Sequence, residues 1–442
     1  MIKKRFLLFA AVLFACSALM LWAGGEQEKA GGADEGTGTI RVWKMGGTPK
    51  EVEFWPVVNE KFSQQYPEVQ LDYSFFYGQI RRSKIISGYK AGNLADVVIA
   101  FGQDIPDFAG LRIIQPLDDI DATTVESWKG NIVPEIFNVT MYQGKQYALP
   151  TYVDMAPFLA YNLDDVEGAG LDGPPRTWSE LKEYAEKMNR PDRPGMVLQA
   201  TKAPVDINIF EGIAYNNGGR FLDEENGNIV INQAGFVDAL QLYVDLVEAD
   251  VTNANLTEDN FKVGATLFGE NKAAMWVGMS WLITPWFGKE VEGLRWDGTA
   301  FPKPDRVSGN FEPSAAVMDP TACLMITSTS ENPKAAMKYL DFWAQPEQLN
   351  LWGTEEIARV PAGKEAYDLP ELEEAWPEWV KLYHEGTLFE GAVTVPRFLG
   401  ITGAEPELAN AIQKAILLQD SPQNALDEAA KAAQENYDLL HE

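Results

Sequence analysis

Three tryptophans, Trp276, Trp281 and Trp286, stand five residues apart in the segment MWVGMSWLITPWF. A step of five residues changes face on an α-helix and on a β-strand, so neither element would bury all three rings together. The residues AAMWVG favour a strand, which places Trp276 in the core and presents Trp281 from the loop or helix start that follows. For Trp286 the sequence leaves both roles open. Indole rings outside the core could cover the flat C–H faces of a sugar.

A regular pattern of strands and helices begins at Thr39. It predicts a strand at 39–45, a helix that ends before Pro67, a strand at 69–76, a helix over 78–92 and an apolar strand at 96–102. This βαβαβ order predicts a parallel sheet, and the unbroken apolar run of the last strand is typical of burial on both faces. The fold class is therefore α/β, and 442 residues with 46% apolar content are enough for at least two domains.

The turns after the first and third strands are candidate binding positions, because ligands bind outside the carboxyl ends of the strands in such sheets. Glycines there admit a close backbone approach and could lie at a helix N-terminus, although each turn could also be an ordinary tight turn. The candidates are Gly46, Gly47, Phe101, Gln103 and Asp104.

Later segments predict further elements. Residues 142–162 are too long and too interrupted for one strand and predict a crossing between domains, with Tyr152 and Asp154 in its middle. Thr177 and Glu180 form a predicted capping box at the start of a helix. An apolar strand is predicted near residue 322, followed by a helical stretch over 332–353, and two capped helices end the chain.

Composition excludes several classes of function. The formal net charge of -29 would repel nucleic-acid phosphates and anionic lipids. Two histidines and two cysteines cannot assemble the usual zinc or copper site, and no metal or other cofactor is expected. The GxGxxG match at 168–173 follows no clean strand and runs into two prolines, which argues against a dinucleotide site. The chain has no GxSxG, HExxH or Walker motif.

The N-terminus predicts export. Residues 1–23 join a basic end to an apolar run and predict a secretory signal peptide, and residues 24–38 predict a flexible spacer. A lipoprotein box ending at Cys16 would instead leave a lipid anchor, but the apolar ALMLWA that follows favours cleavage before Gly24. An uncleaved anchor is a third alternative. The mature protein is expected in the periplasm or at the cell surface, with Cys323 as a buried thiol.

Eight segments occur in the order seen in the extracellular solute-binding proteins of ABC importers. They are RVWKMGG, EFWPVVNEKFSQQYPEVQL, GNLADVVIAFGQD, GLRIIQPLDD, GKQYALPTYVD, YNLDD with PPRTWSEL, FEGIAYNNGGRF and LFGENKAAMWVGMSWL. From about residue 39 to its end the chain resembles family 1, the sugar- and maltodextrin-binding relatives. The resemblance implies a periplasmic-binding-protein-like fold, in which two α/β lobes joined by a hinge close on a ligand. It implies lobe one at 39–150 plus 315–360 and lobe two at 151–314 plus 361–442.

The resemblance also implies ligand contacts. Trp281 lies where relatives stack a sugar ring, Asp154 lies where they place a carboxylate on sugar hydroxyls, and Gln103 and Asp104 lie on the matching turn of lobe one. Further candidates in VDINIFEGIAYNNGG are Asp206, Asn208 and Glu211, although Glu211 could instead cap a helix. Arg359 and Arg397 could reach the cleft from loops, but a solvated position is favoured for both.

The expected function is the binding component of an ABC importer, which captures a mono- or oligosaccharide by lobe closure and delivers it to a membrane permease. The protein is expected to be a monomer and not an enzyme. One alternative is a different solute, such as a peptide or a polyamine. The other is a secreted glycoside hydrolase, which would need two carboxylates about 5–10 Å apart. The 65 Asp and Glu residues leave that alternative open.

Overall fold

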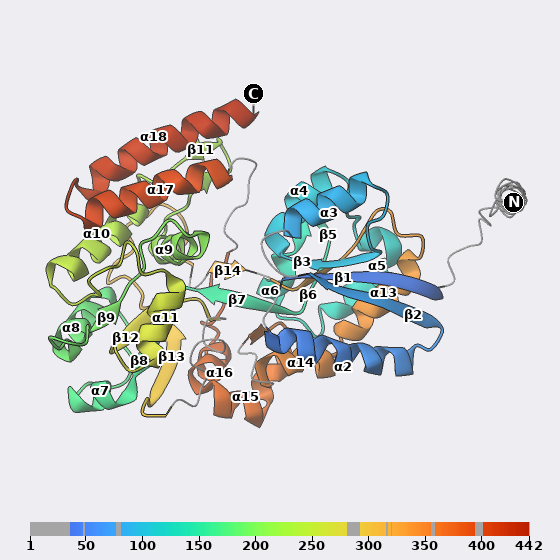
Figure 1. Cartoon of the computed structure of the whole chain (residues 1–442), viewed down its shortest axis with the longest axis horizontal. Helices are drawn as coiled ribbons and strands as arrows, with labels where there is room; N and C mark the ends of the chain where they lie inside the picture. Colours follow the sequence, from blue (N-terminus) through green and yellow to red (C-terminus); the bar gives the residue numbers. More distant parts are fainter. Residues whose placement is uncertain are drawn as a thin grey trace, which may run out of the picture. The chain divides into compact units, whose positions relative to one another are not determined.

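The computed structural model describes residues 36–46, 49–76, 81–280, 292–314, 317–319, 321–354, 359–393 and 401–441 (Figure 1). Several sequence predictions fall outside these residues. They concern the signal peptide, most of the spacer, the processing site at Cys16, and the candidate residues Gly47, Trp281, Trp286 and Arg397.

The first sheet has five strands in the order β2-β1-β3-β15-β6. They are β1 (Gly38–Met45), β2 (Val69–Phe76), β3 (Val97–Ala100), β15 (Cys323–Ile326) and β6 (Leu149–Pro150). β1 pairs in parallel with β2 and β3, as the βαβαβ pattern predicts, and every residue of β3 is buried. β15 is the strand predicted near residue 322, and Cys323 is buried in it. It lies antiparallel to β3, so the sheet is mixed rather than purely parallel.

Helices that pack beside this sheet contribute a cluster of tryptophans to the core. In α2 (Pro49–Gln65) the buried residues Trp55, Val58 and Phe62 recur at helical spacing. The Trp55 ring centroid lies 4.1 Å from that of Trp343 and 5.6 Å from that of Trp352. These partners come from α13 (Pro333–Trp343) and α14 (Pro346–Thr354), the two helices into which the stretch over 332–353 divides. The neighbouring elements are α3 (Arg81–Lys90), η1 (Gly102–Asp104), α4 (Ile105–Gly110), α5 (Asp118–Trp128), α6 (Pro134–Asn138), β4 (Met141–Tyr142) and β5 (Lys145–Gln146).

A strand crosses from the first sheet to a second one. β7 (Tyr152–Ala156) follows β6 of the first sheet and precedes β8 (Phe158–Asn162) of the second (Figure 1). It pairs antiparallel with β14 (Val317–Asp319), which leads back to β15, and with β16 (Val360–Pro361). The crossing predicted within 142–162 is therefore β7. The residue boundaries of the two lobes stay a prediction.

The second sheet has four strands in the order β13-β8-β12-β9. Besides β8 these are β9 (Met196–Val197), β12 (Met275–Gly278) and β13 (Trp296–Ala300). β8 pairs antiparallel with β12 and β13, and β9 pairs in parallel with β12. Trp276 lies in β12 and is fully buried, so its predicted place in the core is confirmed.

The helix start predicted at Thr177 and the two C-terminal helices are present, although the first of these C-terminal helices begins before the Pro406 at which its start was expected. The Thr177 hydroxyl accepts a hydrogen bond from the Glu180 N–H (3.2 Å) and caps α8 (Trp178–Met188), while the Glu180 carboxylate accepts one from the Arg176 N–H (2.7 Å). The chain ends with α17 (Ile401–Ile416) and α18 (Pro422–His441). The other elements are α7 (Leu163–Gly168), α9 (Pro204–Asn216), β10 (Leu222–Asp223), β11 (Asn228–Ile229), α10 (Ala234–Glu248), α11 (Phe261–Gly269), η3 (Lys364–Asp368), α15 (Pro370–Ala375) and α16 (Pro377–His384).

Gly195 directly precedes β9 and packs against the backbone of α8. A Cβ at this position would lie 1.9 Å from the Ala185 carbonyl oxygen, so the helix backbone would have to move. We expect Gly195→Ala to lower the free energy of unfolding by about 1–3 kcal/mol, measured by urea denaturation. Gly110→Ala is the matched control, because a Cβ there meets no atom within 4 Å. Equal stabilities for the two variants would contradict the proposed backbone contact.

Candidate functional site

The turns after β1 and β3 lie side by side at the carboxyl edge of the first sheet. Gly46 has a φ of 71°, a left-handed conformation that favours glycine. Its N–H donates to the carbonyl oxygen of Phe76 at the end of β2 (2.9 Å). A Cβ at Gly46 would lie 3.8 Å from the ring of Phe101, which follows β3. The three strand ends therefore meet where a ligand site is expected in an α/β sheet.

Arg81, the first residue of α3, holds the turn after β3. Its Nε donates to Asp104 Oδ2 (2.7 Å), and its guanidinium carbon lies 3.7 Å from the centroid of the Phe101 ring. Gln103 lies between Phe101 and Asp104 in the sequence, and its Oε1 accepts no hydrogen bond within the described part of the chain. The edge thus brings together an aromatic ring, an amide and a carboxylate, kinds of group that suit a polar ligand with flat apolar faces, although Asp104 is only 3% exposed and is already paired with Arg81. Arg81 is not among the residues predicted from the sequence.

Asp154 lies in β7, and both of its carboxylate oxygens are bonded within the protein. Oδ1 is 2.5 Å from Arg359 Nη1, and Oδ2 accepts a hydrogen bond from Thr321 Oγ1 (2.8 Å). Arg359 is only 4% exposed, so the expectation of a solvated arginine is wrong. The reason is its position directly before β16, since the pairing of β16 with β7 brings the guanidinium beside Asp154.

Two more charged residues complete this arrangement. Arg359 Nη2 donates to Glu51 Oε1 (2.9 Å), and Lys44 Nζ lies 3.3 Å from Glu51 Oε2. The Tyr152 hydroxyl also donates to Glu51 Oε1 (3.3 Å). We call Lys44, Glu51, Asp154 and Arg359 the buried ion cluster, because no more than 5% of any of these side chains is exposed.

Burial and charge pairing act against each other in the buried ion cluster. Burial raises the pKa of Asp154, although Arg359 opposes this, and burial lowers the pKa of Lys44 against the attraction of Glu51. Burial would also raise the pKa of Glu51, but Lys44 and Arg359 outweigh it and hold that pKa below its usual value. Burial disfavours the charged form of Arg359 too, yet Asp154, Tyr152 and Glu51 raise its pKa. Two cations thus face two anions in a site closed to water.

One member of the buried ion cluster left a signal in the sequence. Ile40, Val42 and Lys44 alternate along β1 and therefore share a face, and the first two are fully buried. A lysine on that face requires a buried carboxylate partner. Glu51 gives no comparable signal, because an acidic residue in the first turn of a helix is common.

The three remaining candidates, Asp206, Asn208 and Glu211, are all buried on α9. Asp206 accepts hydrogen bonds from the Thr201 hydroxyl and from the Phe261 N–H (3.1 Å), which joins α9 to the start of α11. Burial raises the pKa of Asp206 to about 6, against these hydrogen bonds.

The structure therefore divides the candidate residues into three groups. Gly46, Phe101, Gln103 and Asp104 gather at the sheet edge, Tyr152 and Asp154 belong to the β7 crossing, and Asp206, Asn208 and Glu211 lie on α9. Ligand contact by any of these residues stays a prediction. Within the described residues, no group of three or more His, Cys, Asp and Glu side chains is placed to hold a metal ion.

The raised pKa of Asp206 makes stability depend on pH. The usual pKa of an aspartate is 3.8, so the folded protein keeps Asp206 protonated up to about pH 6. This difference in proton binding stabilises the folded state fully below pH 3.8, and the stabilisation is lost as the pH rises through 6. The difference between the usual and the raised pKa corresponds to about 3 kcal/mol of folding free energy. We therefore expect the stability of Asp206→Asn relative to the unsubstituted protein, measured as the free energy of unfolding, to be about 3 kcal/mol higher at pH 7 than at pH 3.5.

Urea unfolding at several pH values measures this difference. Asp192→Asn, at an exposed position in the same part of the chain, serves as the control for the change in net charge. A free-energy difference between Asp206→Asn and the unsubstituted protein that does not vary with pH would show that Asp206 does not titrate in this way.

Comparisons with known proteins agree in family and fold. Residues 47–349 match the family described as bacterial extracellular solute-binding protein. A Brucella abortus (strain 2308) protein named as a binding protein is 24% identical over 403 residues, which are 90% of this chain and 92% of that protein.

Two solved structures show the same fold. The sugar-binding protein MalE of Xanthomonas citri has a TM-score of 0.75 and 22% identity, covering 91% of this chain and 98% of that one. Maltose-bound MalE3 of T. maritima has a TM-score of 0.73 and 24% identity, covering 90% and 100%. The predicted periplasmic-binding-protein-like fold is thus confirmed. Because the family pattern matches well over half of its length, the chain belongs to the bacterial extracellular solute-binding proteins.

Proposed function

We propose that this protein captures a mono- or oligosaccharide between its two lobes and delivers it to the membrane permease of an ABC importer. The observation that carries the proposal is the agreement in fold over about nine tenths of the chain with proteins named for maltose or sugar binding. Lobe closure works as a capture step if the closed state binds the ligand more tightly than the open state does.

The carboxyl edge of the first sheet supports a sugar in particular. A sugar presents flat C–H faces surrounded by hydroxyls, and it is bound by aromatic rings together with carboxylate and amide groups. Phe101, Gln103 and Asp104 supply these three kinds of group within four residues, and Gly46 keeps the backbone close to the Phe101 ring. In this proposal these residues contact one side of the ligand.

The second lobe supplies the opposing contacts in this proposal. Trp281 follows β12 in the sequence and stacks on a sugar ring, and the polar residues of α9 lie in the same lobe. The protein acts as a monomer that binds its ligand without changing it chemically.

Export fits this role. The matching family is described as extracellular, and residues 1–23 have the composition of a signal peptide. Of the helices that the structure describes, none combines the length and the apolar character required to cross a bilayer.

Isothermal titration calorimetry with a panel of mono- and oligosaccharides tests the proposal. We expect saturable binding of at least one sugar by the protein purified after export. Trp281→Leu should weaken that binding by about tenfold or more, because the ring face that covers the sugar is lost. Trp281→Phe is the matched control and should retain most of the affinity, since it keeps an aromatic face.

Analysis of the sugar after each titration separates the alternatives. Intact sugar supports a binding protein, whereas cleaved sugar would replace the proposal with a glycoside hydrolase. If no sugar of the panel binds, the ligand is a different class of solute.

A further inference from the structure

The strand β7 changes its partners in the middle. In its first half, Tyr152–Asp154, Tyr152 and Val153 pair with β16, and Asp154 belongs to the buried ion cluster, whose other members come from β1, α2 and the residue before β16. In its second half, the Met155 N–H donates to the hydroxyl of Ser280, just after β12 (3.0 Å). A Cβ at Gly212 of α9 would lie 2.6 Å from Pro157 Cδ, so α9 also packs closely at the end of β7. The change from charged to apolar surroundings falls between residues 154 and 155, while the pairing with β14 spans residues 154–156.

Charge holds the first half in place. Pulling Asp154 away from Arg359 would leave a buried charge without its partner, which is strongly unfavourable. The chain returning from β14 to β15 is attached at the same point, because the Thr321 hydroxyl donates a hydrogen bond to Asp154 Oδ2. One carboxylate therefore connects the crossing at β7 and the return through Thr321 to the side of the first sheet.

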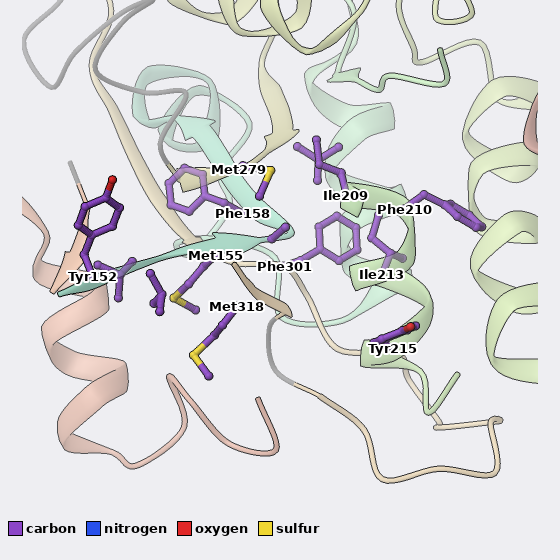
Figure 2. Close-up of a cluster of buried hydrophobic side chains, with 14 of the residues drawn as sticks. Tyr152, Met155, Phe158, Ile209, Phe210, Ile213, Tyr215, Met279, Phe301 and Met318 are labelled. Carbon is purple, nitrogen blue, oxygen red and sulfur yellow. The ribbon is translucent and has the colours of Figure 1, made fainter. Parts of the chain in front are cut away.

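The second half of β7 lies among apolar side chains instead of charged ones. Figure 2 shows Met155 in an apolar cluster that includes Phe158, Met279 and Met318. Met318 is the partner of Met155 in the pairing of β14 with β7. Methionine has an unbranched, flexible side chain that adapts to changed packing. The packing around the second half of β7 can thus rearrange in a way that the buried ion cluster cannot.

We propose that the buried ion cluster anchors residues 152–154 and Thr321 to the first lobe, so that the two lobes rotate about Met155–Pro157. Arg359 is then a positioning residue for lobe closure, because its buried guanidinium is paired with Asp154 and Glu51. The part of this inference that concerns ligand-driven closure rests on the proposed function. The location of the pivot concerns the ligand-free protein as well.

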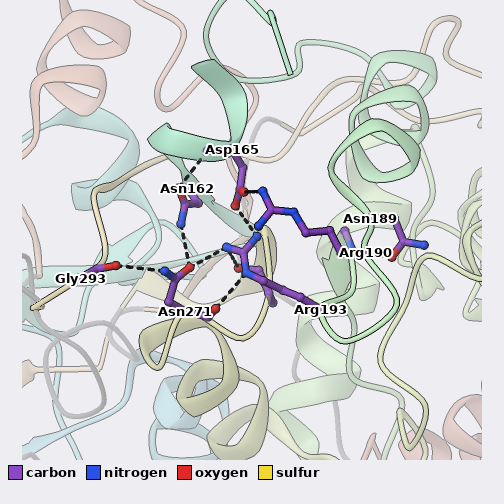
Figure 3. Close-up of polar contacts among 9 residues, drawn as sticks. Asn162, Asp165, Asn189, Arg190, Arg193, Asn271 and Gly293 are labelled. Atoms are coloured by element: carbon purple, nitrogen blue, oxygen red, sulfur yellow. Dashed lines mark hydrogen bonds and ion pairs between the residues drawn. The ribbon is translucent and has the colours of Figure 1, made fainter. Parts of the chain in front are cut away.

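A second buried ion pair, away from β7, separates this role from a purely structural one. Asp165 Oδ2 in α7 lies 2.5 Å from Arg193 Nη1, and Arg190 Nη2 donates to Asp165 Oδ1 at 2.7 Å (Figure 3). The Asp165 and Arg193 side chains are 5% and 9% exposed, a burial close to that of Asp154 and Arg359. If buried ion pairs only stabilise the fold, breaking either pair should have the same effect.

Pulsed electron paramagnetic resonance measures the distance between spin labels on the two lobes. The labels are attached at Lys90→Cys in α3 and Glu186→Cys in α8, both exposed, in protein that carries Cys16→Ser, while Cys323 is buried. The test variants are Asp154→Asn and Arg359→Gln, and Asp165→Asn is the control. Thr321→Val removes a single hydroxyl contact to Asp154 and serves if the charge variants do not fold.

We expect Asp154→Asn and Arg359→Gln to broaden the ligand-free distance distribution or shift it by several ångströms, and Thr321→Val to do so to a smaller extent. Asp165→Asn should lower the melting temperature but leave the distribution unchanged. Unchanged distributions in folded test variants, or the same broadening in Asp165→Asn, would overturn the proposal. Adding sugars to the unsubstituted protein tests the proposed function separately, because failure to change its distribution would not affect the ligand-free comparison.

Discussion

The contact between Asp154 and Arg359 joins side chains 205 positions apart and connects the three strands β7, β14 and β16 at one point. Asp154 stands opposite Asp319 in the register of β7 with β14, and Arg359 directly precedes the two residues of β16. Strands of two and three residues have few backbone hydrogen bonds of their own. The buried charges therefore define where these short strands pair, and this pairing determines how the chain passes from one sheet to the other.

Stability alone does not explain a buried ion cluster at this place. Removing charges from water costs free energy that their attraction often only offsets, and well-packed apolar side chains of similar volume can stabilise a protein as much. An ion pair differs in being directional, because Arg359 must present separate nitrogens to Asp154 and Glu51. Apolar packing of the kind around Met155 allows neighbouring geometries of similar energy. In β7 the directional ion pairs therefore end at Asp154, and the adaptable apolar packing begins at Met155.

Local sequence patterns were enough to predict the elements that position the site. Alternation and apolar runs predicted β1, β2, β3, β12 and β15, and the Thr177 cap was predicted from its own four residues. The partners of Asp154 could not be predicted in this way, because Thr321 and Arg359 reach it only through strand pairings between distant segments. Arg359 resembles a surface arginine in its local sequence, and only the pairing of β16 with β7 shows that it is buried. Lys44 was not among the predicted residues, although its alternation with Ile40 and Val42 on the buried face of β1 indicates an acidic partner.

The sheet edge and the buried ion cluster share β1, because Gly46 follows Lys44 by two residues. A ligand held only at this edge would contact the anchored lobe equally well in open and closed states, and equal affinity for two states shifts no equilibrium. In the proposed mechanism, closure must therefore be driven by contacts that form only when the second lobe approaches. The candidates for those contacts are Trp281 and the polar residues of α9, while Arg81, Phe101 and Asp104 supply a preformed surface for them to close against. On this argument, substitutions at the sheet edge would weaken the initial encounter, and substitutions in the second lobe would weaken the coupling between binding and closure.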